Sequence, residues 1–245
     1  MKKTVLITGA SRGIGRACAI YFAQRGYDVG VNYLNNRECA ESVAEIIRSM
    51  GRNAVLLQGD VAIFSEARAI ISRCTDEFGH IDVIVNNAGI AQQKLFTDIT
   101  PDEWRRMFAV NVDGIYNILH AALPQMISRK SGSIVNVSSM WGVQGASCEV
   151  HYSAAKSAVI GLTKALATEL APSNIRVNCV APGLIDTDMN KNLSSEDLQG
   201  VIDEIPLGKI GKAEDVAHAV FFLADNDASP FTTGAVLNVN GGMVI

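Results

Sequence analysis

The chain has 245 residues, of which 48% are hydrophobic and 19% are charged, a balance typical of a globular protein with a large core. Its 21 Lys and Arg residues against 25 Asp and Glu residues give a net charge of −4 without a long basic run, which argues against a nucleic-acid partner. Five cysteines without a CxxC spacing fit neither a disulfide framework nor a zinc site, so we expect no metal. One of the longest uncharged stretches, residues 131–148, is rich in Ser and Gly, and the amino terminus does not resemble a secretory signal. We therefore expect a cytoplasmic protein that has no membrane partner.

Short apolar runs of strand length alternate with segments of helical spacing along the whole chain. Most of the runs are apolar throughout, as expected for strands that are covered on both faces. The predicted strands are residues 4–7, 29–33, 54–58, 82–86, 133–137, 176–180 and 235–239, and the predicted helices are 14–25, 37–50, 65–78, 101–128, 152–171 and 213–224. This alternation predicts an α/β fold with a doubly wound, seven-stranded parallel sheet and helices on both of its faces. No linker or repeat interrupts it, so we expect a single domain over residues 1–245.

Two of the predicted helices carry further signals. Thr100, Pro101 and the acidic residues after them predict a helix start, with Thr100 as the N-cap and Pro101 at the first helical position. The helix through residues 154–170 is apolar almost all round, and one sheet can cover only one side of it. We therefore expect a second subunit to cover the other side; a well-buried helix of a monomer is the alternative.

A glycine-rich loop follows the first predicted strand and leads directly into a helix. Its residues include Gly9, Ser11, Arg12, Gly13, Ile14 and Gly15. Glycines allow a tight turn and a close approach of the backbone to a pyrophosphate, and the amino terminus of the following helix attracts negative charge. The spacing GxxxGxG differs from the common GxGxxG, and a loop that serves only packing is the alternative. Its place in the first strand–helix unit favours a dinucleotide site.

The residues after the second predicted strand indicate which nucleotide the site prefers. Sites for NAD commonly place an acidic residue there, about 20 residues after the loop, to bind the ribose 2′-hydroxyl. Here Asn35 and Asn36 follow the strand, with no acid before Glu38, while Arg12 in the glycine loop could meet a 2′-phosphate. We therefore expect NADP(H); a solvated loop arginine is the alternative.

Tyr152 and Lys156 are four residues apart and share one face of a predicted helix. A free tyrosine titrates near pH ~10 and is a poor base at neutral pH. A neighbouring ammonium favours the phenolate, as does an oxidised nicotinamide if one is bound, so we expect both to lower the pKa of Tyr152 and prepare it for proton exchange with a carbonyl or alcohol oxygen. Ser139 ends a predicted strand, where its hydroxyl could bind the same oxygen, and Ser138 is the competing candidate. We expect His151, next to Tyr152, to be pocket wall or surface.

These residues, together with Asp60-Val61, Asn86-Asn87-Ala88-Gly89, Asn111 and Pro182-Gly183, give the chain a resemblance to the short-chain dehydrogenase/reductase family over essentially its whole length. The resemblance implies a single-domain Rossmann fold, an NADP-dependent oxidoreductase and a homotetramer. It implies that Ser139 orients the carbonyl and that Tyr152 is the acid–base group. It also implies that Lys156 binds the nicotinamide ribose and lowers the tyrosine pKa, while Asn111 completes a water-mediated proton path. Beyond the glycine loop, the implied cofactor residues are Asn35, Asp60, Val61, Asn87, Ala88, Gly89, Tyr152, Lys156, Pro182, Gly183, Ile185 and Thr187.

Within the family the chain is most similar to 3-oxoacyl-(acyl-carrier-protein) reductases, through residues 205–208, 214–217 and 238–243. That similarity implies a small ketone or an acyl thioester as the substrate, the thioester being carried on an acidic acyl carrier protein. Arg129 and Lys130 are expected to attract this carrier at the cleft. Residues 172–174 carry no basic residue where many relatives have Arg.

The stretch from Met140 to Val150 contains two substrate-pocket candidates, Trp141 and Glu149. The stretch is similar to reductases of the 5-aminopentanone group on modified elongation factor P, and a carboxylate at residue 149 would suit the ammonium of such a substrate. A solvated acid at a helix start is the alternative for Glu149. An alcohol or hydroxysteroid dehydrogenase and a non-catalytic dinucleotide sensor are further alternatives for the chain. We expect residues 188–211 to form a lid over the substrate.

Overall fold

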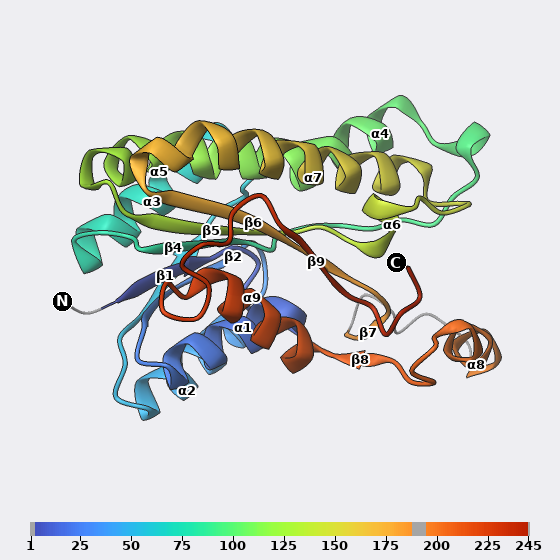
Figure 1. Ribbon diagram of the computed structural model, residues 1–245, viewed down its shortest axis with the longest axis horizontal. Helices are drawn as coiled ribbons and strands as arrows, with labels where there is room; N and C mark the ends of the chain where they lie inside the picture. The colour runs from blue at the N-terminus through green and yellow to red at the C-terminus, as the bar shows by residue number, and fades with distance from the viewer. Residues whose placement is uncertain (1–2, 188–194, 245) are drawn as a thin grey trace.

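A seven-stranded sheet runs through the centre of the protein in the computed structural model, which describes residues 3–187 and 195–244 (Figure 1). The strands are β1 (Thr4–Ile7), β2 (Asp28–Tyr33), β3 (Ala54–Gln58), β4 (Val83–Asn86), β5 (Gly132–Val137), β6 (Ile175–Pro182) and β9 (Val236–Val239). All neighbouring strands are parallel, in the order β3-β2-β1-β4-β5-β6-β9. The direction of the winding therefore reverses between β1 and β4, which is where doubly wound folds bind their ligands.

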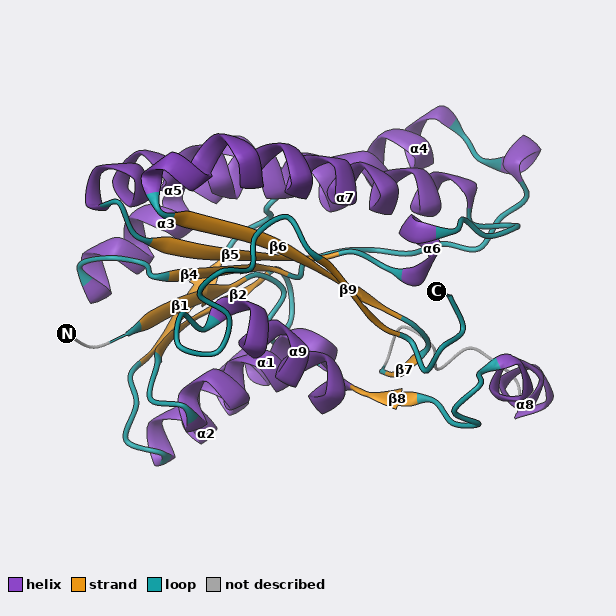
Figure 2. Cartoon of the chain, viewed as in Figure 1, coloured by secondary structure: helices purple, strands orange, loops and turns teal. Residues whose placement is uncertain are grey.

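Helices cover both faces of the sheet (Figure 2). One layer consists of α1 (Gly13–Gln24), α2 (Arg37–Ser49) and α9 (Ala213–Ala224), and the opposite layer of α3 (Phe64–Phe78), α5 (Gly114–Arg129) and α7 (Val150–Leu170). The shorter helices α4 (Pro101–Phe108), α6 (Met140–Val143) and α8 (Ser195–Glu204) lie toward the carboxyl ends of the strands, as does a small parallel pair, β7 (Ile185–Asp186) and β8 (Gly211–Lys212). In the described part of the chain, no helix is long and apolar enough to cross a membrane.

Successive side chains of a strand point to opposite faces of the sheet, and this alternation divides the core in two. Val5 and Ile7 pack with the layer of α1, α2 and α9, whereas Leu6 between them packs with α3, α5 and α7. Val85 and Ile84 in β4 are divided in the same way. Because both faces are buried, the strands are mostly apolar, as the sequence predicts.

The structure confirms the predicted α/β fold with a seven-stranded parallel sheet, and the predicted elements begin and end within two residues of the observed ones, with one exception. The helix predicted over residues 101–128 is divided into α4, a π-helical turn over Ala109–Asp113, and α5. A π-helical turn often marks a functional site, and this one carries Asn111. No sequence pattern predicted α6, α8 or the pair β7–β8.

The start of α4 confirms the predicted cap. Thr100 Oγ1 accepts a hydrogen bond from the Glu103 N–H at 3.2 Å, and Glu103 Oε2 accepts one from the Thr100 N–H at 2.8 Å. This pair is a capping box, and Pro101 occupies the first helical position.

One side of α7 packs on the sheet and the other side is exposed. Val159 and Thr163 lie on the buried side, whereas Ser157, Gly161 and Ala165 are exposed. The chain itself therefore covers only one side of a helix that the sequence shows to be apolar almost all round.

The predicted lid, residues 188–211, lies partly outside the described residues. Its described part contains α8 and the segment that leads into β8. Ile205 in this segment is buried, and it packs against Gly241 near the carboxyl terminus. Closure of the segment over a substrate stays a prediction.

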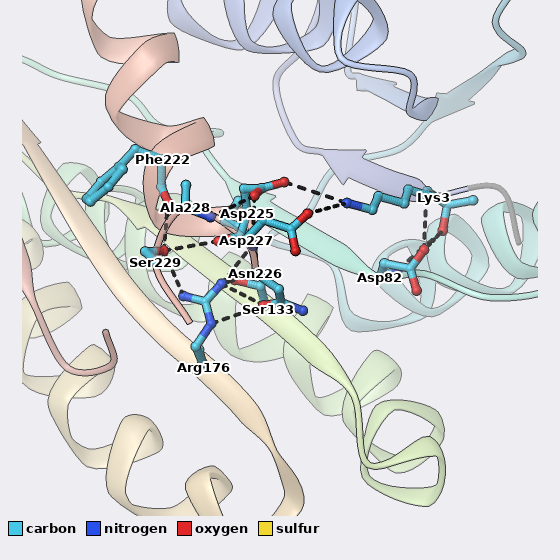
Figure 3. A network of polar contacts seen from close by, with 12 residues as sticks. Lys3, Asp82, Ser133, Arg176, Phe222, Asp225, Asn226, Asp227, Ala228 and Ser229 are labelled. Carbon is cyan, nitrogen blue, oxygen red and sulfur yellow. Dashed lines mark hydrogen bonds and ion pairs between the residues drawn. The ribbon is translucent and has the colours of Figure 1, made fainter. Parts of the chain in front are cut away.

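A buried arginine ties the amino-terminal edge of the sheet to the segment before β9 (Figure 3). Arg176 in β6 is 8% exposed. Its guanidinium donates to the side chains of Ser133, Asn226 and Ser229 and to the carbonyls of Leu223, Ala224 and Thr232, at 2.7–3.3 Å. Beside this network, Lys3 forms ion pairs with Asp225 and Asp227 at 3.7 and 3.8 Å.

Candidate active site and cofactor cleft

A cleft of about 770 Å³ opens at the carboxyl ends of β1 to β4. Its walls are the segments that follow these four strands, together with Arg106 in α4, Val110 in the π-helical turn and Thr187 after β7. Among the residues predicted to bind a cofactor, those that line the cleft are Gly9, Ser11, Arg12, Gly13, Ile14, Asn35, Asp60, Val61, Asn87, Ala88, Gly89 and Thr187. The structure thus brings together residues from four separate strand ends, as the fold requires of a ligand site.

The glycine loop after β1 depends on backbone conformations that other residues disfavour. Gly9 has a φ of +63° and Gly13 a φ of +54°, both in the left-handed region. A Cβ on Gly9 would lie 3.0 Å from the Cα of Ala88, so the loop after β1 closely approaches the loop after β4. A Cβ on Gly15 would overlap the Gly9 carbonyl oxygen, so this glycine allows α1 to pack against the loop.

Asn87 and Thr8 hold the glycine loop in place. Asn87 donates from Nδ2 to the carbonyls of Thr8 and Gly9 at 2.9 and 3.2 Å. Thr8 Oγ1 accepts hydrogen bonds from the backbone N–H groups of Asn87 and Ala88, each at 3.0 Å. The side chain of Asn87 therefore shapes the cleft by fixing its glycine loop.

Asn32 in β2 is a third support of the loop that the motif analysis missed. Its Oδ1 accepts from the Gly9 N–H at 3.1 Å, and its Nδ2 donates to the carbonyls of Leu57 and Gly59 at 2.9 and 3.2 Å. The signal in the sequence is a lone amide inside an otherwise apolar strand, where a buried polar group needs partners.

The charges of the cleft favour an anionic ligand. Arg12 is exposed in the glycine loop, and Asn35 and Asn36, rather than an acid, line the cleft after β2. Among the described lining residues Asp60 is the only acid, and it forms an ion pair with Arg106 at 3.1 Å. Sequence reasoning missed Arg106 because no motif contains it.

Six predicted cofactor residues are not among those that line this cleft: Gly15, Tyr152, Lys156, Pro182, Gly183 and Ile185. Pro182 ends β6, and a Cβ on Gly183 would lie 2.7 Å from the Cα of Asn240, so glycine allows two segments to cross closely there. Ile185 is buried and packs against Gly211. These contacts position the segment between β6 and β8, and a contact of Pro182, Gly183 or Ile185 with a cofactor stays a prediction.

The structure separates the two candidate serines after β5. Ser138 donates from Oγ to the Lys156 carbonyl at 2.7 Å, so its hydroxyl anchors α7. Ser139 caps α6, where its Oγ accepts from the Trp141 N–H at 3.2 Å, and it also hydrogen-bonds the phenol of Tyr152. Ser139 is therefore the serine that lies at the tyrosine.

Tyr152 lies in the first turn of α7 and is 9% exposed. Burial raises the pKa of its phenol to about 12, although the hydrogen bond with Ser139 acts in the opposite direction; the charge of Glu149 raises this pKa further. The Lys156 Nζ lies 5.7 Å from the ring centroid, and a lowering of the Tyr152 pKa by this ammonium stays a prediction. The phenol stays protonated at neutral pH, which suits a proton donor.

Lys156 is 4% exposed, and its Nζ donates to the Val137 carbonyl at 3.0 Å. Burial lowers the pKa of this ammonium to about 8. A Cβ on Gly89 would lie 3.3 Å from the Nζ, so only a glycine at this position leaves room beside the ammonium. The ammonium of Lys156 therefore lies next to Gly89, a residue of the cleft wall.

Asn111 brings an open acceptor to the same place. Its Nδ2 donates to the carbonyls of Ile90 and Met107, each at 3.0 Å. Its Oδ1 is buried, has no hydrogen-bond partner among the described residues, and would lie 2.7 Å from a Cβ on Gly89. A buried acceptor next to a buried ammonium is a place where a bridging water or ligand hydroxyl completes the hydrogen bonds.

On the other side of Tyr152, residues 92–94 run alongside residues 148–151. Three contacts join the two segments: Gln92 Oε1 with His151 Nε2 at 3.0 Å, Gln93 Nε2 with Glu149 Oε1 at 3.4 Å, and the Lys94 N–H with the Cys148 carbonyl at 2.7 Å. His151 is fully buried by this arrangement, so of the two expected positions, pocket wall or surface, the surface is excluded. The pairing fixes the start of the helix that carries Tyr152.

Glu103 of α4 holds residues 92–94 through hydrogen bonds to two of their side chains. Its carboxylate accepts from Gln92 Nε2 and from Lys94 Nζ, each at 2.8 Å. These hydrogen bonds, led by the one from Lys94, lower the pKa of Glu103 to about 2. The capping box of α4 is thereby connected to the segment beside Tyr152.

Both substrate-pocket candidates lie near Tyr152. Trp141 packs into a small apolar cluster around Met107, Tyr152 and Ala155. Glu149 is half-buried, and burial raises the pKa of its carboxyl, with a smaller opposite effect of the hydrogen bond from Gln93. An indole and a carboxylate therefore flank the phenol.

Arg129 lies far from this region. It binds Asp82 at 3.3 Å and the Ile81 carbonyl, at the amino-terminal edge of the sheet and opposite the cleft. The expectation that Arg129 and its neighbour Lys130 attract a carrier at the cleft is therefore wrong within one chain.

Comparisons with known proteins identify the family to which the chain belongs. A family model described as enoyl-(acyl carrier protein) reductase matches residues 9–244. The 3-oxoacyl-(acyl-carrier-protein) reductase FabG of Staphylococcus aureus is 43% identical over 243 residues, which cover 99% of this chain and 98% of the relative. The chain belongs to the short-chain dehydrogenase/reductase family.

Further comparisons agree with the family. The FabG reductase of Aggregatibacter actinomycetemcomitans is 44% identical over 245 residues, covering 99% of this chain and all of the relative. The crystal structure of 3-oxoacyl-(acyl-carrier protein) reductase from Brucella melitensis superposes with a TM-score of 0.93 at 37% identity, covering all of this chain and 92% of that one. This short-chain dehydrogenase/reductase is an oxidoreductase that acts on CH–OH or C=O groups, as the sequence predicts.

Membership of the family implies a nicotinamide dinucleotide cofactor, and the cleft fits one. Gly9 and Gly89 line it where a Cβ would press on Ala88 and on Asn111, and Asn111 Oδ1 presents an unpaired acceptor beside Lys156. No group of three or more His, Cys, Asp or Glu side chains that could hold a metal ion occurs in the described ranges.

Proposed function

We propose that this short-chain dehydrogenase/reductase uses NADPH to reduce the ketone of a 3-oxoacyl thioester carried on an acyl carrier protein. The observation that carries the proposal is the phenol of Tyr152, which is buried and hydrogen-bonded to Ser139 near a cleft of dinucleotide size. Its raised pKa keeps it protonated at neutral pH. The names of the similar reductases support the substrate.

The chain's residues divide the work at the carbonyl oxygen. The Tyr152 phenol gives its proton to that oxygen, and the Ser139 hydroxyl donates a second hydrogen bond that orients it and stabilises developing charge. The bound nicotinamide supplies the hydride. The Lys156 ammonium stabilises the phenolate that remains, and the open Oδ1 of Asn111 holds a water through which the proton is replaced.

Arg12 supports NADPH as the nucleotide. It is exposed at the mouth of the cleft, and the positions after β2 that line the cleft with it carry no acid that would repel a 2′-phosphate. Equal or higher kcat/KM with NADH than with NADPH would overturn this part of the proposal, and Arg12→Ala should narrow the preference for NADPH.

Replacement of Tyr152 by Phe tests the mechanism. Tyr152→Phe removes the donated proton and leaves the packing of the ring, so ketone-dependent oxidation of NADPH should fall by at least about 100-fold while NADPH binding stays nearly unchanged. Initial rates give the first quantity and a fluorescence titration with NADPH the second. Unchanged turnover in this variant would contradict the proposed role of Tyr152.

A second substrate class, a 5-aminopentanone group on modified elongation factor P, is favoured by one observation. The Glu149 carboxylate lies close enough to Tyr152 to raise its pKa, and a carboxylate there favours a substrate ammonium over a fatty acyl chain. A panel of acetoacetyl thioester, small amino-ketone and hydroxysteroid distinguishes the classes. Glu149→Gln should raise KM for the amino-ketone and leave KM for the other two substrates unchanged. Glu45→Gln, at an exposed site of α2, should leave KM unchanged for all three substrates.

We also propose a single domain over residues 1–245, a lid formed by residues 188–211 and a homotetramer. The exposed side of α7 and the exposed Tyr116 and Ile127 of α5 support an interface between copies of the chain. A Cβ on Gly161 would meet nothing within 4 Å in the described chain, so Gly161→Arg should be tolerated by the fold and yet reduce the oligomer. Light scattering after size-exclusion chromatography measures this mass; an unchanged mass in the variant would place the interface elsewhere.

A further inference from the structure

Arg106 and Asp60 form a bridge across one end of the cofactor cleft. Arg106 lies in α4 and Asp60 follows β3, and the guanidinium Nη2 lies 3.1 Å from Asp60 Oδ2. Both residues line the cleft. The bridge therefore joins two walls that lie 46 residues apart in the chain.

Asp60 is held rigidly, which makes it a firm support for the guanidinium. Its N–H donates to Glu66 Oε2 at 2.7 Å, and its Oδ1 accepts from the Ala62 N–H at 2.9 Å. Its side chain is 14% exposed, whereas that of Arg106 is 48% exposed. In the described part of the chain, Arg106 has no other hydrogen-bond partner, so most of its planar surface stays available along the cleft.

The surroundings of this bridge are apolar. Val61 and Val110 line the same end of the cleft and are almost completely buried. The carbonyl of Val61 accepts a hydrogen bond from Asn117 Nδ2 at 2.9 Å, and a Cβ on Gly114 would lie 2.7 Å from its Cγ2, so α5 fixes this wall. Two valines, a carboxylate acceptor and a planar cation together suit a flat heteroaromatic ring that carries an amino group.

We propose that Arg106 is a clamp on the adenine ring of the cofactor. Its guanidinium, oriented by the ion pair with Asp60, stacks on the purine. Arg106 thereby sets the affinity for the adenosine half of the cofactor and takes no part in the chemistry. The inference rests on the proposed function only for the identity of the cofactor.

Direct binding measurements on Arg106→Ala test the clamp. Dissociation constants of NADPH, NADH and reduced nicotinamide mononucleotide, which lacks the adenosine half, come from fluorescence titration of the protein. Stacking of a cation on an aromatic ring predicts that both dinucleotides bind about tenfold more weakly, by the same factor, while the mononucleotide is unaffected. Arg106→Lys should restore only part of the affinity, because an ammonium has no planar surface.

Arg105→Ala is the matched control. Arg105 is the neighbouring residue of α4, is 72% exposed, pairs with Asp102 at 2.7 Å and does not line the cleft. An exposed ion pair stabilises a fold little, so both variants should fold, which circular dichroism verifies. Arg105→Ala should leave all three dissociation constants unchanged.

Several outcomes overturn the clamp. Weaker binding of NADPH alone would place Arg106 at the 2′-phosphate, and unchanged binding of both dinucleotides, or an equal loss in Arg105→Ala, would remove its role. These titrations need no turnover, so failure of the clamp and failure of Tyr152 as the proton donor are separate results.

Discussion

Arg176 and Lys156 are both buried cations, but the protein surrounds them differently. Arg176, at the amino-terminal edge of the sheet, donates seven hydrogen bonds to side chains and carbonyls around it. Lys156, near the carboxyl-terminal edge, has one acceptor among the described residues, the Val137 carbonyl. The unpaired Oδ1 of Asn111 lies close to it, since both approach the same face of Gly89.

This difference separates a structural cation from a functional one. The network of Arg176 is closed, and its partners come from β5 and from the segment before β9, so it joins parts of the fold. The surroundings of Lys156 are open, and burial lowers the pKa of its ammonium to about 8. Buried polar groups that lack protein partners are where a ligand or water completes the hydrogen bonds, and this distinguishes the surroundings of Lys156 from those of Arg176.

The largest expected effect is on the closed network. Arg176→Met should lower the free energy of unfolding by about 3 kcal/mol or more, because the carbonyls of Leu223, Ala224 and Thr232 lose their donor inside the protein. Urea unfolding followed by circular dichroism measures the loss. The kcat of the folded fraction should not change, and Arg48→Ala, which removes an exposed pair with Glu41, should cost less than about 1 kcal/mol. A stable Arg176→Met protein with low kcat would reverse the comparison.

The pH dependence of stability sharpens the same comparison. Lys156 titrates near pH 8 in the fold and near 10.5 when exposed, so between these values the unfolded chain binds the extra proton and folding becomes more favourable as pH rises. Relative to Lys156→Met, the wild type should gain up to about 1 kcal/mol per pH unit from pH 8 to 9.5. Tyr152, whose pKa is raised to about 12, acts in the opposite direction only above about pH 10. Urea unfolding at each pH gives the free energy of unfolding of the two proteins. A constant difference between them from pH 8 to 9.5 would show that the pKa of Lys156 is not lowered by burial.

Asn111 should affect the rate as well as stability. Asn111→Leu removes an acceptor that the fold leaves unpaired, so kcat should fall at least about tenfold at saturating cofactor; it also removes the donor to the Ile90 and Met107 carbonyls, which should cost about 1–3 kcal/mol of stability. The control is Asn117→Leu, because Asn117 is equally buried and its amide supports the Val61 carbonyl. Asn117→Leu should lower stability by about 1–2 kcal/mol with kcat unchanged. If both variants lose kcat equally, the open acceptor has no special role.

The smallest expected effect is at the cap of α4. Thr100→Ala removes the hydrogen bond to the Glu103 N–H and should cost about 1 kcal/mol of stability with little change in kcat. Thermal unfolding measures it. Thr100→Ser keeps the hydroxyl and should recover most of the loss; a Ser variant as unstable as Ala would assign the cost to the lost methyl group.

Much of the fold can be predicted from the sequence, because apolar runs and helix caps are patterns of neighbouring residues. Seven short apolar runs, most of them apolar throughout, predict strands buried on both faces, and Thr100-Pro101 predicts a helix start that the structure confirms. The boundaries of these elements follow from hydrophobic periodicity and capping within a few residues. The π-helical turn over Ala109–Asp113 has no such signal, because it is stabilised by contacts of Asn111 with the distant Ile90 carbonyl.

The candidate site was also largely predictable, but the roles of neighbouring residues were not. Ser138 and Ser139 are equivalent in the sequence, and only the contact of Ser138 with the Lys156 carbonyl and of Ser139 with Tyr152 distinguishes them. The raised pKa of Tyr152 could not be predicted from the sequence either, because it is due mainly to burial, which depends on the whole fold.

By itself the sequence determined the α/β architecture, the glycine loop and the set of Asn111, Ser139, Tyr152 and Lys156, because residue type and short-range spacing carry that information. Only the tertiary structure decided that Arg106 meets Asp60, that Asn111 and Lys156 approach Gly89, and that Arg129 lies at the opposite edge from the cleft. Those outcomes depend on the strand order and on helix packing, which place residues that are far apart in the chain within hydrogen-bond distance of one another.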